Sequence, residues 1–276
     1  MSGVLYLVPT PIGNLGDLSD RVRETLSAAD FIAAEDTRVS LRLLNHLGLK
    51  KPLVSYYEHN RAESGPRILA RLLDGETCAL VSDAGTPAIS DPGQDLVALC
   101  FDAGVPVRAV PGPCAAITAL AASGLPTGRF TFEGFLSTAP KSRREHLDSL
   151  RGERRTMIFY EAPHKLVRTL SDFVSVFGPE RRISLCRELT KLHEEILRTT
   201  LGEAAAYYET QTPRGEFVLI LEGAPSPEPA PGPSLADAVN RVNALLAQGL
   251  RRKEAVKQAS DELGVPKNTL YEASLS

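Results

Sequence analysis

The sequence lacks the residue patterns that mark disulfide scaffolds and metal sites. Its four cysteines are widely spaced without a Cys-x-x-Cys pair, and its five histidines show neither a His-Glu-x-x-His motif nor a Cys/His ligand spacing. Cysteines spaced this way inside apolar segments are typically buried, reduced thiols. The sequence therefore predicts no metal site and no disulfide framework.

A long hydrophobic run and a strong charge of one sign are also absent. Residues 109–126 carry no charge, but three prolines and two glycines interrupt them, so they fall short of a membrane span of about 20 apolar residues. No basic leader precedes the first strand-like run, so we expect no signal peptide and a cytoplasmic protein. With a net charge of −3, any polyanion would have to be met by a local basic patch.

Residues 1–125 alternate short apolar runs with amphipathic patterns, which is typical of a doubly wound, mainly parallel α/β sheet. Glycine follows most of the helical patterns, as a C-terminal cap should. The predicted strands cover residues 5–8, 31–34, 53–57, 78–81 and 105–110. The predicted helices cover residues 20–29, 40–47, 67–73, 94–103 and 114–123.

Residues 126–223 are predicted to form a second α/β domain. Two strand patterns, around residues 183 and 196, follow each other without a helix between them, which favours a mixed sheet. Residues 224–233 form a Pro-rich linker. Residues 234–276 are predicted to form a small helical appendage, whose end resembles the turn and second helix of a helix-turn-helix; a plain packing module is an equal alternative.

Three Gly/Pro loops follow predicted strands, within residues 4–14, 78–93 and 107–120. Ligands of open α/β sheets bind beyond the carboxyl ends of the strands, where such loops gather. None of the loops is a dinucleotide or P-loop motif, and none contains a lysine. Exposed backbone and one acid, Asp83, suit an adenosine ligand without phosphates. Asp91, followed by Pro-Gly-Gln, is predicted to cap the next helix.

The loops belong to a longer series of motifs. The series comprises VPTPIGNLGDLSDR, AAEDTR, ALVSDAGTPAISDPG, PGPCAAITALAASGLP, FEGFL, RTMIFYEAPHKL, CRELTKLHEE and RGEFVLILEG. In these motifs and their order, from about residue 5 to 274, the chain resembles the ribosomal RNA cytidine-2′-O-methyltransferases of the tetrapyrrole methylase superfamily.

This resemblance implies two α/β domains of the tetrapyrrole methylase type with S-adenosylmethionine between them. It implies methyl transfer to the ribose 2′-oxygen of a decoding-centre cytidine in 16S ribosomal RNA, on the small subunit, by a homodimer. One alternative is a methyltransferase for a tetrapyrrole or corrin precursor, although such enzymes usually carry a GxGxGD-type first loop. Another is a ribosome-assembly factor without activity.

The resemblance also implies roles for individual residues. The cofactor would contact Pro11, Ser82, Asp83, Ala84, Gly85, Thr86, Pro113, Cys114, Ala115, Tyr160 and Gly215. Asp36 is a candidate to orient or deprotonate the 2′-hydroxyl, although an acid in this position is commonly an N-cap, and Glu216 is its rival.

A basic stretch supplies candidates for RNA contact. Residues 141–155 hold six Lys/Arg against three acids; such a run is usually a solvated helix face, but an acidic protein that binds RNA needs a local phosphate-binding surface. The predicted RNA-binding residues are Arg38, Arg61, Lys141, Arg143, Arg144, Arg187 and Lys191. Four cations at residues 251–253 and 257 form a second, weaker patch.

Overall fold

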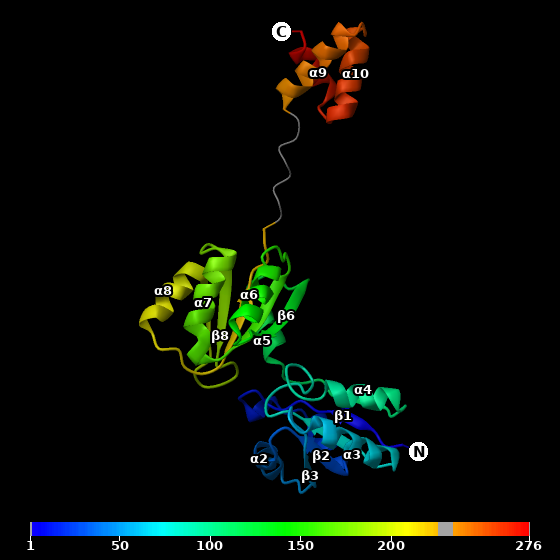
Figure 1. The fold of residues 1–276 in the computed structure, drawn as a ribbon, viewed down its shortest axis with the longest axis vertical. Coiled ribbons are helices and arrows are strands. Elements are labelled where there is room, and N and C mark those ends of the chain that lie inside the picture. Colours follow the sequence, from blue (N-terminus) through cyan, green and yellow to red (C-terminus); the bar gives the residue numbers. More distant parts are fainter. Residues whose placement is uncertain (1, 226–233, 276) are drawn as a thin grey trace. The chain divides into compact units, whose positions relative to one another are not determined.

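The structure is a computed structural model that describes residues 2–225 and 234–275. Contacts along the chain divide it into two compact units, Met1–Ala224 and Pro225–Ser276 (Figure 1). Most of the predicted linker, residues 226–233, lies outside the described residues. Each unit is therefore described by itself.

The first sheet of the larger unit is entirely parallel, as predicted. Its strands follow the order β3-β2-β4-β1-β5, and Leu5 pairs with Cys78 on one side and Val107 on the other. All four residues of both β2 and β4 are buried, which a parallel sheet covered on both faces requires. The strands are β1 (Leu5–Leu7), β2 (Phe31–Ala34), β3 (Leu53–Ser55), β4 (Cys78–Val81) and β5 (Val107–Ala109).

Helices cover both faces of this sheet. Val22 and Leu44 pack on one face, and Ile68 and Leu96 pack on the other. Helix α1 is preceded by a short 3-10 helix, η1 (Leu15–Asp17), which the sequence patterns did not predict. The α-helices are α1 (Asp20–Ala28), α2 (Thr37–Leu47), α3 (Arg61–Leu73) and α4 (Gln94–Asp102).

Helix α3 begins at Arg61 rather than at the predicted residue 67. The side chain of Asn60 accepts a hydrogen bond from the Tyr57 N–H at 2.8 Å and donates to the Ser55 carbonyl at 3.1 Å, which fixes the chain before the first turn. The helix contains a Gly-Pro pair, Gly65 and Pro66, a dipeptide that usually marks a turn. The glycine instead permits close packing, since a Cβ on Gly65 would lie 3.1 Å from the side chain of a leucine on α4.

The second sheet is mixed, as predicted, in the order β6-β7-β10-β8-β9. Among the described strand pairs of this second sheet, only β6–β7 is parallel. Three helices cover one face, where the rings of Phe159 and Phe173 lie 4.9 Å apart. The strands are β6 (Phe130–Phe135), β7 (Thr156–Glu161), β8 (Arg182–Arg187), β9 (Glu195–Thr200) and β10 (Phe217–Leu221). The helices are α6 (Pro140–Ser149), α7 (Pro163–Phe177) and α8 (Leu201–Thr210).

Helix α5 (Ala115–Ala122) covers the other face of the second sheet. It follows β5 in sequence, but Ala119 and Leu120 pack with Ile158, Val218 and Ile220 of the second sheet. Small residues along α5 let it lie close to the strands. The predicted boundaries at residues 125 and 223 remain predictions, and α5 joins the two sheets into one compact unit.

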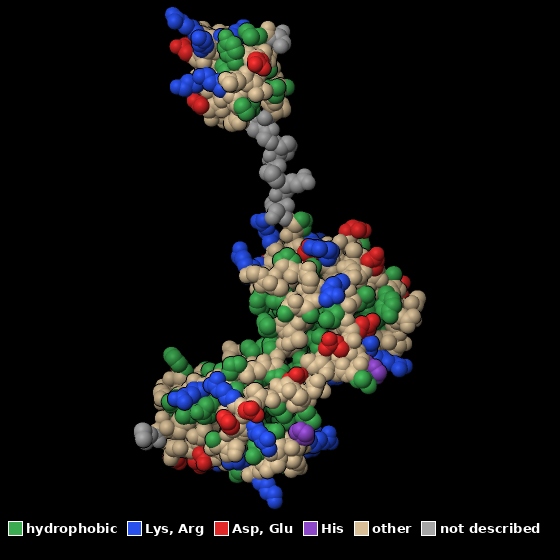
Figure 2. Space-filling model, turned by 180° about the vertical axis from the view of Figure 1, so that it is seen from behind, with side chains coloured by type: hydrophobic (Ala, Val, Ile, Leu, Met, Phe, Trp, Pro, Cys, Tyr) green, Lys and Arg blue, Asp and Glu red, His purple; other side chains and the backbone are tan. Residues whose placement is uncertain are grey.

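The smaller unit is a three-helix cluster, formed by α9 (Leu235–Ala247), α10 (Arg252–Leu263) and α11 (Lys267–Ala273). Its core includes Val242 and Val256, and Arg241 on α9 pairs with Glu262 on α10 at 2.7 Å. Figure 2 shows several Lys and Arg side chains gathered on the α10 side of this unit.

All four cysteines are free thiols in the structure. Cys78, Cys100 and Cys186 are buried, and Cys114 is half-buried. Burial raises the pKa of the Cys78 thiol to about 12, so this thiol is uncharged and unreactive. Within the described residues, no helix combines the length and apolar character needed to cross a bilayer.

Candidate active site

The three Gly/Pro loops are fastened to one another at the carboxyl edge of the first sheet. Thr10 and Gly85 exchange two backbone hydrogen bonds of 2.9 and 3.0 Å. The Thr10 hydroxyl donates to the Ser82 carbonyl at 3.1 Å, and the Thr86 hydroxyl donates to the Pro113 carbonyl at 2.8 Å. Gly85 has a φ of 86°, which only glycine adopts without strain. The loops therefore form a stiff backbone platform.

Backbone strain is concentrated in two loops beside this platform. Ala88 and Ser90 have φ values of 67° and 66°, and Glu188 and Thr190 have values of 52° and 65°. Non-glycine residues in this region cost about 1–3 kcal/mol each and cluster at functional sites. Both loops contribute to the walls of the same cavity.

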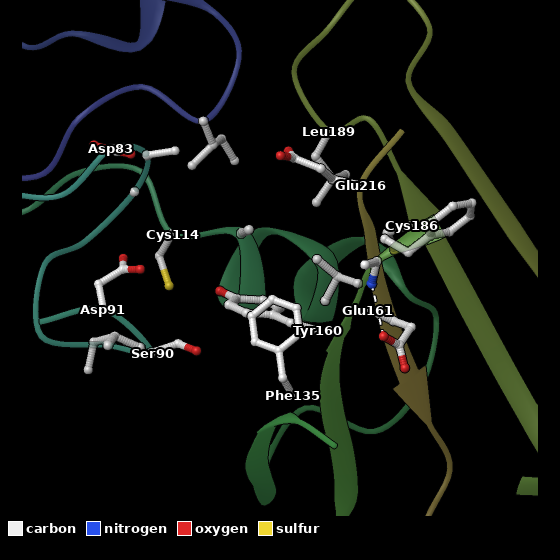
Figure 3. Close-up of a pocket in the computed structure, with 18 of the residues that line it drawn as sticks. Asp83, Ser90, Asp91, Cys114, Phe135, Tyr160, Glu161, Cys186, Leu189 and Glu216 are labelled. Atoms are coloured by element: carbon white, nitrogen blue, oxygen red, sulfur yellow. Dashed lines mark hydrogen bonds between the residues drawn. The ribbon is translucent and has the colours of Figure 1, made fainter. Parts of the chain in front are cut away.

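The cavity has a volume of about 570 Å³ and lies between the loops of the first sheet and the edge of the second (Figure 3). This volume is within the range of small-molecule sites. The residues that line it are Ile12, Glu35, Asp83, Ala84, Gly85, Thr86, Ile89, Ser90, Asp91, Cys114, Ala115, Phe135, Tyr160, Glu161, Ala162, Pro163, His164, Cys186, Leu189, Lys191, Glu216, Phe217 and Val218.

An aromatic wall closes the cavity on the side of the second sheet. The ring of Tyr160 meets Phe132 and Phe135 edge-on, with centroids 5.1 and 5.5 Å apart. Its hydroxyl accepts a hydrogen bond from the Ala116 N–H at 3.1 Å, and burial raises the pKa of Tyr160 to about 12. The tyrosine is therefore a neutral, fixed surface suited to a planar apolar group.

Carboxylates gather on the opposite side. Burial, and then the neighbouring charge of Glu35, raise the pKa of Asp91 to about 7. Burial and the charge of Asp83 raise the pKa of Glu35, and partial burial raises the pKa of Asp83. These shifts share one cause, negative groups held together in a poorly hydrated site. A cation placed among them would relieve the repulsion.

Asp91 does not cap α4, so that prediction was wrong. The N-cap of α4 is Gly93, with a φ of 149° and no side-chain capping bond. A Cβ on Gly93 would lie 2.9 Å from Ala88, so the chain enters the helix through a conformation that only glycine accepts. Asp91 is thereby left in the cavity wall.

The two predicted catalytic carboxylates lie in different places. Asp36 lines neither this cavity nor a smaller, second cavity beside α2. Its side chain caps α2 and pairs with Arg38 at 2.6 Å. Hydrogen bonds from Arg38 lower the pKa of Asp36 to about 2, and its N–H donates to Asp83 Oδ1 at 3.0 Å. Glu216 does line the cavity, and Lys191 Nζ lies 3.1 Å from its carboxylate.

The structure also places the other predicted cofactor residues. Those that line the cavity are Asp83, Ala84, Gly85, Thr86, Cys114, Ala115 and Tyr160. Pro11 and Ser82 instead line a second cavity beside α2. Pro113 supports the platform through its carbonyl, and Gly215, with a φ of 81°, lies so close to Glu188 that a Cβ would come within 2.5 Å of that side chain.

The predicted RNA-binding residues differ in burial and in whether a carboxylate already pairs with them. Arg143 is 5% exposed, and its guanidinium donates to Asp172 and Thr169, so it is not available to a phosphate. Arg144 is exposed and has no side-chain hydrogen bond or ion pair among the residues described. The others are paired with carboxylates: Arg38, Arg61, Lys141, Arg187 and Lys191.

The sequence patterns missed Glu161, which is 4% exposed and lines the cavity. Its carboxylate accepts hydrogen bonds from the Ala162 N–H at 2.9 Å and from the Thr169 hydroxyl at 2.5 Å. The first of these is the dashed line in Figure 3. Both Glu161 and Ala162 belong to the motif FYEAPHKL, which was the available signal.

Comparison with known proteins identifies the family. Residues 4–205 match the family described as tetrapyrrole (corrin/porphyrin) methylases, and residues 233–276 match the one described as the RsmI C-terminal HTH domain. The chain belongs to the tetrapyrrole methylase family.

Two curated relatives match almost the whole chain. A ribosomal RNA small subunit methyltransferase I of Synechocystis is 50% identical over 273 residues, covering 99% of this chain and 98% of the relative. One of Escherichia coli O157:H7 is 48% identical over 275 residues, covering 99% and 95%. The resemblance read from the motifs is thus confirmed.

Solved structures of other tetrapyrrole methylases share the fold. The uroporphyrin-III C-methyltransferase of Thermus thermophilus, complexed with S-adenosylhomocysteine, aligns with a TM-score of 0.53 at 19% identity. The alignment covers 97% of that chain but 79% of this one, so about a fifth of this chain has no counterpart there.

Proposed function

We propose that this protein transfers a methyl group from S-adenosylmethionine to the ribose 2′-oxygen of a cytidine in 16S ribosomal RNA of the small ribosomal subunit. The observation that carries the proposal is the full-length similarity to enzymes named for small-subunit ribosomal RNA. That similarity covers 99% of this chain, including the C-terminal helical unit, whereas the uroporphyrin enzyme aligns with 79% of it. This difference favours RNA over a tetrapyrrole precursor.

The residues of the larger cavity fit S-adenosylmethionine. The carboxylates with raised pKa values suit its sulfonium and ammonium charges, and Tyr160 and Phe135 suit its adenine ring. Asp83 to Thr86, Cys114 and Ala115 supply backbone and small side chains around it. Ser82 and Pro113 hold these loops by hydrogen bonds, and Pro11 and Gly215 adjoin Ile12 and Glu216 of the cavity wall. When bound, S-adenosylmethionine supplies an electrophilic methyl group.

Proton removal from the 2′-hydroxyl is assigned to Glu216. It is the predicted catalytic carboxylate that lines the cavity, and it is 81% exposed at its side chain, so RNA can reach it. Lys191 Nζ pairs with its carboxylate at 3.1 Å. Asp36 is assigned a positioning role, because its N–H holds Asp83 and its carboxylate is held by Arg38.

RNA contact is assigned first to Arg144, which has no ion-pair partner among the described residues. Lys141 and Arg38 come next, because their side chains are 89% and 86% exposed. Arg61, Arg187 and Lys191 keep this role as more weakly placed candidates. The homodimer and the cytoplasmic location expected from the resemblance are also part of the proposal. A second copy would cover exposed apolar side chains such as Phe101, which is 82% exposed.

Methyl transfer to isolated subunits tests the function. The protein would be incubated with labelled S-adenosylmethionine and small subunits from cells that lack it, and the 2′-O-methyl position would be mapped on the RNA. Label at one cytidine ribose is expected. Label on a uroporphyrinogen and none on subunits would overturn the proposal in favour of the tetrapyrrole alternative, and donor-independent subunit binding would favour an assembly factor.

A further inference from the structure

A second cavity of about 290 Å³ lies beside the first, between the loop after β1, helix α2 and the end of β4. Asp83 lines both cavities. In Figure 3 its carboxylate points away from Tyr160, and thus away from the aromatic wall of the larger cavity. The residues that line the second cavity are Thr10, Pro11, Gly13, Leu15, Val39, Ser40, Arg42, Leu43, His46, Ser82 and Asp83.

Ser40 gives this cavity an unused polar group. The side chain is 4% exposed, and within the described part of the chain its hydroxyl has no hydrogen-bond partner. A buried hydroxyl without a partner destabilises a folded protein. Its presence in a cavity wall is explained if a ligand completes its hydrogen bonding.

The rim of the cavity adds donors. Arg42 and His46 lie one turn apart on the exposed side of α2, and the side chain of Arg42 makes no hydrogen bond or ion pair with any described residue. Leu15 and Leu43 form apolar walls. A planar polar ring flanked by a negative charge matches this combination of hydroxyl, cation and apolar surface.

The volume limits the occupant. Sites for whole small molecules span about 300–1,000 Å³, so this cavity of about 290 Å³ lies just below that range and suits a single ring better than a nucleoside cofactor. A nucleotide whose ribose lies at Asp83 would have its 2′-oxygen toward the larger cavity and its base in the smaller one.

We propose that the second cavity receives the base of the target pyrimidine nucleotide, with Ser40 and His46 on its polar edge and Arg42 on a flanking phosphate. This inference rests on the proposed function and adds to it a site that selects the base. The base must leave its stack to enter the cavity, as nucleotides do in other enzymes that act on a single residue.

Ser40→Ala separates this role from a structural one. Because the hydroxyl has no partner in the free protein, its removal should leave Tm unchanged or raise it, and donor affinity by calorimetry should not change. The kcat/KM for small subunits should fall about three- to tenfold, the loss expected for one neutral hydrogen bond. Arg42→Ala should lower kcat/KM further and reduce its salt dependence, whereas the exposed Arg21→Ala is the matched control.

Base selection supplies the second readout. With subunits that carry uridine in place of the methylated cytidine, the wild-type protein should lose activity, and Ser40→Ala and His46→Ala should narrow the difference between the two substrates. A Ser40→Ala protein with unchanged kcat/KM and unchanged base preference, beside an active wild type, would overturn this inference alone. A lower Tm would likewise indicate a structural role, and an inactive wild type would remove the proposed function as well.

Discussion

Arg143 Nε donates to the carboxylate of Asp172 at 2.6 Å, beneath the surface of the α6–α7 pair. The same guanidinium donates to the Thr169 hydroxyl at 2.8 Å, and that hydroxyl donates to Glu161 in the cavity wall. One polar network thus links the two helices to the site.

Replacing Arg143 with alanine should destabilise the fold. Removing one partner of a fully buried ion pair costs about 3–5 kcal/mol; Asp172 is 35% exposed at its side chain, so we expect a decrease of about 2–3 kcal/mol in the free energy of unfolding. Urea denaturation measures it. The adjacent Arg144→Ala is the control and should change stability by less than about 0.5 kcal/mol. Equal effects of the two substitutions would contradict the burial assigned to Arg143.

Arg144 should matter for RNA instead. An exposed arginine that neutralises one phosphate contributes nearly one unit to the slope of log affinity against log salt. Arg144→Ala should therefore weaken binding to small subunits and reduce that slope by about 0.7–0.9, measured by filter binding from low to physiological salt. An unchanged slope would exclude this contact.

Donor affinity should depend on the ionisation of Asp91. Its pKa near 7 means that the carboxyl is mostly protonated at pH 6 and mostly ionised at pH 8, and the ionised form attracts the sulfonium charge. Affinity for S-adenosylmethionine should rise by up to about tenfold over this range, as measured by calorimetry.

S-adenosylhomocysteine is the matched control ligand for Asp91, because it carries the same amino acid group without the positive sulfur. The affinity for S-adenosylhomocysteine should change less with pH than the affinity for S-adenosylmethionine. In the Asp91→Asn variant, the two ligands should show the same pH dependence of affinity. Parallel pH profiles for both ligands in the wild-type protein would show that Asp91 does not contact the sulfonium.

Glu216 and Asp36 should respond differently to removal of their charge. Loss of a general base typically lowers a rate by 10²–10⁴, so Glu216→Gln should lower single-turnover methylation by about that factor. Asp36→Asn preserves a good N-cap and should keep the rate within about threefold. The reverse result would return the proton-accepting role to Asp36.

The sheets could be predicted because their strands carry their own signal. The buried runs of β2 and β4 are apolar throughout, and β8 and β9 follow each other without room for a helix. The parallel topology alone then predicted that the loops after β1, β4 and β5 lie at the carboxyl edge of the first sheet. Their hydrogen bonds to one another depend on backbone geometry that no residue pattern encodes.

The errors arose where residues were read by type rather than by position. Arg143, Leu147 and Leu150 recur at helical spacing and are all buried, so periodicity placed the arginine on the inner face while composition suggested a basic surface. Asp91 looked like a cap because Pro92 and Gly93 follow it, but the φ of Gly93 turns the chain before the helix begins. Glu161 could not be found from charge, because its partners are the neutral Ala162 N–H and the Thr169 hydroxyl on α7.

Helix α5 directly follows β5, the last strand of the first sheet, but it covers one face of the second sheet. A gene fragment that starts at residue 126 would encode strands whose apolar residues Ile158, Val218 and Ile220 have lost their cover, and we expect it to aggregate. We therefore expect a chimaera of two family members to keep this covering layer only when α5 and the second sheet come from the same parent, with the crossover point before residue 115.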